Sequence, residues 1–172
     1  MKYYYSLIIY FLFCFFLFPQ NIYNKTIKKN ELLRMQIDNY FQWIIQLPFD
    51  FQYKIFKEGI FWNYEGKNLG IEKFFLRTSA IENRKEISLN DWKKEFYLCK
   101  HPYKKIQINT IQNPALNTYI LCKKDDFFIY KSSIFYNNTF YVIYIIWINN
   151  EEWNNNIINF INQIQYKITE LK

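Results

Sequence analysis

The clearest pattern of apolar and polar positions lies near the C-terminal end of the chain. Large apolar residues recur there at steps of one, three and four residues. They are Trp153, Ile157, Phe160, Ile161, Ile164, Ile168 and Leu171. This spacing predicts a long helix that begins near Asn149 and carries one apolar face. We expect that face to pack on a sheet.

Two further helices are predicted earlier in the chain. The first covers residues 31–47: Asn30 is a suitable N-cap, a proline ends the helix, and one face carries Leu33, Ile37, Phe41 and Ile44. The second begins at Ser88, which can form a capping box with Asp91, and it ends near Cys99. Its apolar face carries Leu89, Trp92 and Phe96.

Elsewhere the apolar period changes to about two, which is typical of strands. The expected strands cover residues 51–57, 60–64, 71–77, 106–111, 118–123, 127–135 and 140–148. For residues 71–77 a short helix is the alternative. Polar breaks of hairpin length separate the last three, at residues 123–126 and 136–139. Asparagine tolerates the positive φ that tight hairpin turns need, so an antiparallel meander is expected.

These elements predict an α+β domain over residues 31–172, in which helices pack on an antiparallel sheet of about five to seven strands. Residues 21–30 are polar and basic, and we expect them to form a flexible lead-in. The order of elements over residues 50–172 resembles the PsbP-type sandwich. That resemblance rests on element order and implies a fold, not a function.

The first twenty residues are typical of a targeting segment. Lys2 precedes an apolar run from Leu7 to Phe18, which matches the apolar region of a signal peptide and is short for a spanning helix. No small-x-small cleavage pattern follows the run, so the segment is either a signal peptide or an uncleaved anchor. We therefore expect an exported protein, in a periplasm, an extracellular space or the lumen of a secretory pathway.

Two cysteines follow the leader, Cys99 and Cys122. An oxidising compartment favours a disulfide between them, and the alternative is a pair of buried free thiols. No Cys-x-x-Cys or Cys/His ligand spacing is present, so neither a metal site nor a cofactor is expected.

The chain carries 22 Lys and Arg residues against 15 Asp and Glu, a net charge of +7. A disulfide would gather two basic clusters into one patch, made of Lys100, His101, Lys104, Lys105, Lys123 and Lys124. We expect this patch to bind an anion, such as an anionic envelope component or an acidic surface of another exported protein. The alternative is solvated lysines partly neutralised by Asp125 and Asp126. An uncleaved leader would add membrane contact, and export disfavours nucleic acid as a partner.

No catalytic residue stands out. The chain has no phosphate-binding loop, dinucleotide fingerprint, zinc-protease helix or serine elbow. Its aromatic fraction of 23% reflects a general excess of Phe, Tyr, Ile, Asn and Lys and does not by itself indicate a ligand site. We expect a non-enzymatic binding domain. The alternative is a small secreted hydrolase whose active site has no recognisable motif.

Overall fold

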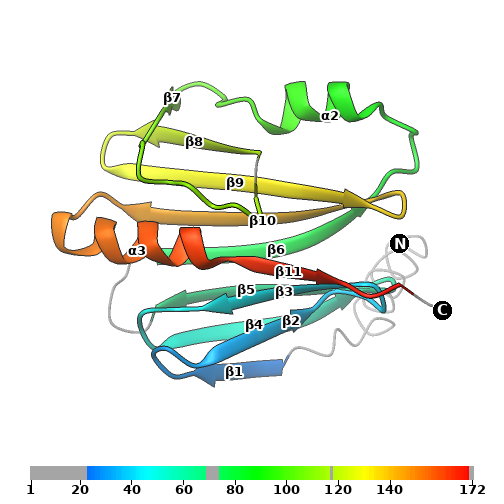
Figure 1. Ribbon diagram of the computed structural model, residues 1–172, viewed down its shortest axis with the longest axis horizontal. Coiled ribbons are helices and arrows are strands. Elements are labelled where there is room, and N and C mark those ends of the chain that lie inside the picture. Colours follow the sequence, from blue (N-terminus) through cyan, green and yellow to red (C-terminus); the bar gives the residue numbers. More distant parts are fainter. Residues whose placement is uncertain (1–22, 69–73, 117, 171–172) are drawn as a thin grey trace, which may run out of the picture.

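The computed structural model describes residues 23–68, 74–116 and 118–170, and these residues form eleven strands and two helices (Figure 1). The strands are β1 (Tyr23–Ile27), β2 (Leu32–Gln36), β3 (Phe41–Gln46), β4 (Phe51–Glu58), β5 (Phe61–Asn68), β6 (Phe74–Glu82), β7 (Lys104–Ile106), β8 (Tyr119–Lys124), β9 (Phe127–Tyr136), β10 (Thr139–Ile148) and β11 (Gln165–Ile168). The helices are α2 (Leu89–Phe96) and α3 (Glu151–Gln163).

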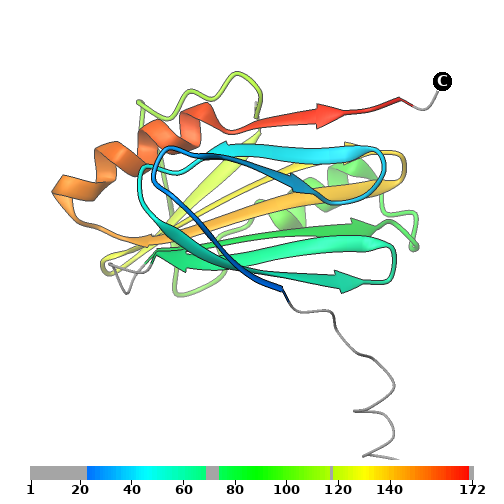
Figure 2. The same ribbon diagram turned by 90° about the horizontal axis from the view of Figure 1, so that it is seen from below.

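Eight strands form one large antiparallel sheet in the order β1-β4-β5-β6-β10-β9-β8-β7. Three more form a second sheet in the order β11-β3-β2. Figure 2 separates the β2–β3 hairpin from the β4–β5 hairpin and shows them as different layers. The large sheet therefore ends in two edge strands, β1 on one side and β7 on the other.

The main core lies between the two sheets because apolar side chains alternate along the strands. In β3, Phe41, Trp43 and Ile45 are almost fully buried, whereas the residues between them reach solvent. Helix α3 completes this core next to the second sheet. The rings of its Phe160 and of Phe74 in β6 have centroids 6.2 Å apart.

Strand β10 is buried on both faces, because the main core covers one face and α2 covers the other. Tyr141, Ile143 and Ile145 belong to the main core. Phe140 and Val142 point the other way and pack with Trp92 and Phe96 of α2 in a smaller cluster. Below, the face that carries the main core is the inner face of the large sheet, and the face that carries α2 is its outer face.

The hairpin turns on either side of β9 match the prediction. Asn137 and Asn138 connect β9 to β10 with φ values of 45° and 56°, and Asp125 lies between β8 and β9 with a φ of 50°. Short polar side chains tolerate this left-handed backbone better than apolar ones do. The meander of β8, β9 and β10 is therefore confirmed.

The helix predicted over residues 31–47 is wrong, because this segment forms the β2–β3 hairpin. Asp38 turns the chain: its Oδ1 accepts hydrogen bonds from the Tyr40 and Phe41 amides at 2.8 and 2.7 Å. Asn30 is a turn residue with a φ of 62° and not a helix cap. The apolar positions also fit a period of two on each side of Asp38, and tertiary packing selects that pattern.

The predicted α+β class is also wrong, since strands dominate the described residues and only two helices occur among them. Residues 23–27, predicted as flexible lead-in, form β1 and pair with β4. The C-terminal helix ends at Gln163, and the chain continues as β11 beside β3. These differences add strands, and the second sheet takes the place of a predicted helical layer. The strand predicted over residues 106–111 is wrong in extent, because β7 ends at Ile106 and residues 107–111 form a loop.

Both remaining helices begin close to where they were predicted, although α3 is shorter than its apolar pattern indicated. Ser88 caps α2, with its Oγ 3.1 Å from the Asp91 amide. Helix α3 buries Ile157, Phe160 and Ile161, as expected from their spacing. The predicted signal peptide or anchor, with its apolar run from Leu7 to Phe18, lies outside the described residues.

Candidate functional site

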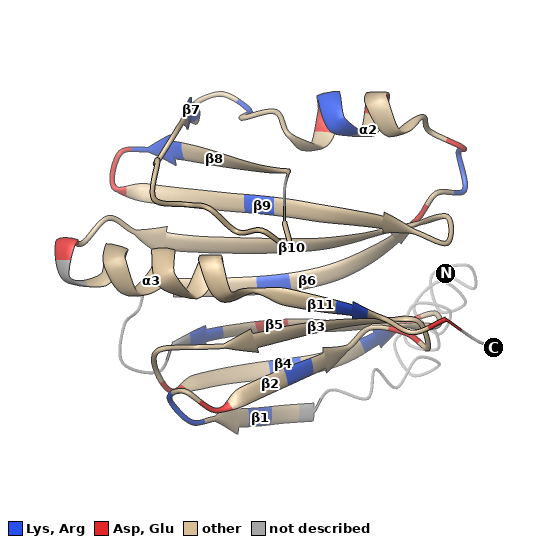
Figure 3. Cartoon of the chain, viewed as in Figure 1, with Lys and Arg blue, Asp and Glu red and all other residues tan. Residues whose placement is uncertain are grey.

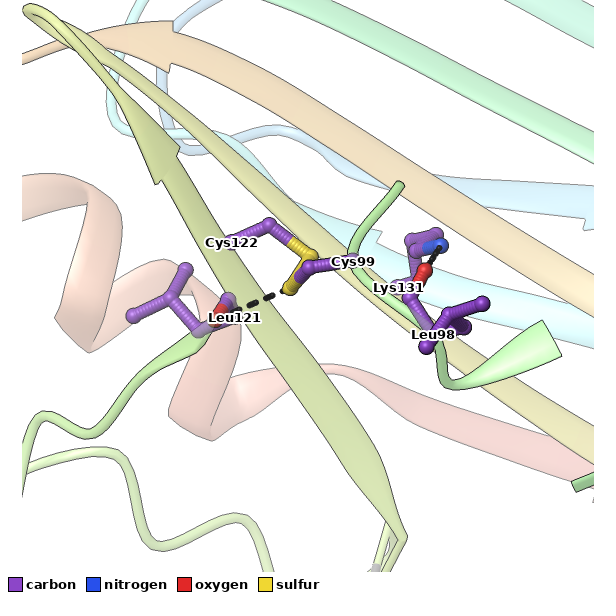
Figure 4. Close-up of a disulfide and its surroundings, with 5 residues drawn as sticks. All are labelled: Leu98, Cys99, Leu121, Cys122 and Lys131. Atoms are coloured by element: carbon purple, nitrogen blue, oxygen red, sulfur yellow. Dashed lines mark hydrogen bonds between the residues drawn. A yellow bond between two sulfur atoms is a disulfide. The ribbon is translucent and has the colours of Figure 1, made fainter. Parts of the chain in front are cut away.

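The predicted disulfide joins Cys99, which follows α2, to Cys122 of β8, and their Cα atoms are 5.6 Å apart. The residue before the bridge is held as well, because the Nζ of Lys131 in β9 donates a hydrogen bond to the Leu98 carbonyl at 3.0 Å (Figure 4). The segment after α2 is therefore fixed to β8 by a covalent bond and to β9 by a polar contact.

Strand β7 follows this segment at the end of the large sheet. Lys104 lies directly opposite Lys123 of β8, and Lys105 lies opposite Cys122. Cβ atoms of such cross-strand neighbours are about 5 Å apart. We call Lys104, Lys105, Lys123 and Lys124 the basic edge. Figure 3 shows positive residues on β7 and at the end of β8, next to an acidic turn.

The four lysines of the basic edge point to both faces of the sheet, because side chains alternate along a strand. Lys104 and Lys123 lie on the inner face, where the Lys123 Nζ is 5.3 Å from the centroid of the Phe128 ring. Lys105 and Lys124 lie on the outer face with Cys122. The sequence predicted one patch, whereas the structure divides these lysines between two faces of one edge.

Lys100 and His101 are exposed in the loop between the bridge and β7. Lys131 adds a positive charge that sequence reasoning missed. Burial lowers the pKa of Lys131, and the nearby charge of Lys100 lowers it further. The alternation of side chains along β9 could have assigned Lys131 to the outer face. Its closeness to Lys100 could not be predicted, because the two residues are far apart in sequence.

None of the six predicted basic residues forms an ion pair within the described part of the chain. Asp125 and Asp126 lie in the exposed turn after β8 and bring negative charge to one end of the basic edge. They make no ion pair with described residues either. The lysine ammonium groups are therefore compensated by solvent, with some long-range attraction from the turn.

A separate groove of about 920 Å³ lies on the outer face over β5, β6 and β10. Its lining includes Phe75, Arg77, Ser79, Tyr144 and Ile146. Burial raises the pKa of Tyr144, and the Arg77 charge acts in the opposite direction. No sequence pattern marks this groove, because it lies where α2 leaves part of the outer face uncovered.

Comparisons of the chain with protein-family models, curated proteins and solved structures give no match. The resemblance in element order to the PsbP-type sandwich therefore carries no functional argument.

The described residues hold no group of three or more His, Cys, Asp and Glu side chains that could bind a metal ion. No helix among them is long and apolar enough to cross a membrane. Cys99 is tied to Cys122, so it has no thiolate available as a nucleophile while the bridge is intact.

Proposed function

We propose that this protein is a non-enzymatic exported domain that binds an anionic partner through the basic edge. The observation that carries the proposal is the position of Lys104 opposite Lys123. Like charges directly opposite each other destabilise a strand pair. Neither lysine has an ion-pair partner among the described residues, so an external anion would relieve their repulsion.

Export is supported by the N-terminal sequence pattern and agrees with the Cys99–Cys122 bridge, because disulfides persist in oxidising compartments. Fusing residues 1–25 to a reporter that is active only outside the cytosol tests this part of the proposal. An inactive reporter would refute export.

The alternative is a small secreted hydrolase that uses the groove on the outer face. Such an enzyme needs a nucleophile hydrogen-bonded to a base, or facing carboxylates with separated pKa values. Ser79 makes no hydrogen bond to a base within the described residues, and Glu82 of the groove is paired with Arg84 at 2.7 Å. Binding through the basic edge therefore has the stronger support.

The test replaces Lys104, Lys105, Lys123 and Lys124 together by Glu. Binding of the parent to inorganic polyphosphate and to anionic vesicles is compared with binding of the variant, at low and at moderate salt. We expect the parent to bind at least one of these anions at low salt, with affinity that falls as salt is added, because screening shortens the reach of surface charge. The variant should lose at least about tenfold in affinity.

A matched control replaces Lys54, Lys85, Lys93 and Lys167 by Glu. These lysines are exposed, lie away from β7 and β8, and give the same change in net charge. Thermal melts of both variants check that the fold is intact. Equal losses in the two variants would show a general charge effect and would overturn the assignment to the basic edge.

A further inference from the structure

We infer that the anionic partner is an acidic, extended polypeptide segment that adds to β7 as a further strand. This inference rests on the proposed function and names the class of partner. It is carried by the free backbone of β7 and by the division of the basic edge between two faces.

Strand β7 is an open edge of the large sheet, because among the strands that the structure describes it pairs with β8 alone. Within the described residues, the backbone of Lys104, Lys105 and Ile106 makes no hydrogen bond outside its pairing with β8. An extended peptide can use the outward-facing N–H and C=O groups of such an edge to add a strand.

The orientation of the lysines distinguishes a strand from a flat anionic surface. A vesicle surface that meets the inner face contacts Lys104 and Lys123 and leaves Lys105 and Lys124 on the far side. An added strand lies in the plane of the sheet, and its own side chains alternate between the two faces. Acidic residues at successive positions of that strand can therefore reach lysines on both faces at once.

The positive charge of the basic edge also determines which extended segments can add to β7. Lysines on an edge strand oppose pairing with neutral or basic strands and so protect the edge from unspecific association. The carboxylates of an acidic strand would instead be attracted to these lysines, which makes the edge selective for acidic segments. The disulfide and the Lys131–Leu98 hydrogen bond fix the chain that leads into β7, so less ordering is required when a partner binds.

The test measures binding of a short fluorescent peptide with the sequence Thr-Glu-Glu-Val-Glu-Glu-Thr, capped at both ends, to the intact protein. The matched control peptide has the same sequence with N-methyl groups on four consecutive central residues. It keeps every charge but loses backbone donors on both of its edges. We expect the control peptide to bind at least about tenfold more weakly at equal salt. Backbone amides of Lys104–Ile106 should exchange with solvent more slowly with the unmethylated peptide alone.

Two pairs of substitutions test the two faces separately. One variant carries Lys104→Glu and Lys123→Glu on the inner face, and the other carries Lys105→Glu and Lys124→Glu on the outer face. We expect both variants to lose peptide affinity by similar factors. A loss confined to one pair would indicate that the peptide lies on one face of the sheet, and it would overturn strand addition.

The outcomes separate this inference from the proposed function. If both peptides bind equally, or if anionic vesicles or polyphosphate bind and the peptide does not, strand addition is wrong and anion binding stands. If the parent binds neither the peptide, nor polyphosphate, nor anionic vesicles at low salt, both proposals are wrong.

Discussion

Gly66 is a residue whose missing side chain the packing requires. It lies on β5, and a Cβ built there would be 2.6 Å from the carbonyl oxygen of Gln52 and would overlap the Phe51 ring. Gly59 is different: it occupies a φ of +61° at the β4–β5 turn, with open space around the position of a Cβ. Gly66 is therefore required because there is no space for a side chain, and Gly59 because of its left-handed backbone.

We predict that Gly66→Ala lowers the free energy of unfolding by about 2–3 kcal/mol, because backbone of β4 must move to make room. Gly59→Ala is the control and should cost about 1 kcal/mol, the penalty of a left-handed backbone for alanine. Urea unfolding followed by tryptophan fluorescence measures both. A Gly66→Ala variant as stable as the parent would show that β4 and β5 are not packed this closely.

At the scale of elements, α3 is the helix most deeply embedded in the main core. Ile161 on its inner side is fully buried, whereas Asn159 on the same helix is exposed. We predict that Ile161→Asp lowers the free energy of unfolding by more than about 3 kcal/mol, because an unpaired carboxylate would enter the core. Asn159→Asp adds the same group at an exposed position and should change stability by less than about 0.5 kcal/mol. Similar melting of the two variants would contradict the burial of this face.

The elements differ in how far their sequences determine them. Helix α3 and the β8–β9–β10 meander were predictable, because strong periodicity and turn residues agree there. The β2–β3 hairpin was not, because Leu33, Ile37 and Phe41 fit both a helix and two strands. The choice depends on the large sheet, which offers an apolar layer for the hairpin to cover. The sequence of residues 31–47 alone does not indicate that this layer is present.

The candidate site shows the same division. The bridge between Cys99 and Cys122 was predictable from the number of cysteines after the predicted leader. The convergence of Lys104 with Lys123 followed from that bridge. Their division from Lys105 and Lys124 depends on the register of β7 with β8, and three residues are too few to define that register from sequence alone.

At the scale of the whole molecule, buried tyrosines make stability depend on alkaline pH. Tyr64 is buried between the sheets, donates a hydrogen bond to the Gln36 carbonyl at 3.2 Å, and has its pKa raised by burial to about 12. Burial also raises the pKa of Tyr130 and, with the Asp38 carboxylate, that of Tyr141. Tyrosine in the unfolded chain ionises near about pH 10.

Because the folded-state pKa of Tyr64 lies above the unfolded value, its contribution is complete below about pH 10 and is lost as the pH rises toward about 12. We predict that the urea concentration at the unfolding midpoint decreases as the pH is raised from about 8 to about 11. The decrease should be smaller in Tyr64→Phe. All other titratable groups are the same in both proteins, so the difference between them isolates Tyr64. Equal falls would mean that the Tyr64 hydroxyl ionises freely in the folded state.

The strand order sets a standoff distance for the domain, should its leader remain in a bilayer. Strand β1 follows the predicted leader within a few residues and is the sheet edge opposite β7. Seven strand spacings of about 4.8 Å separate these edges, or roughly 34 Å across the sheet. A tether at β1 would hold the domain by one side and direct the basic edge, at β7 and β8, away from the headgroups next to the anchor. What they meet would then approach from the space beyond the membrane.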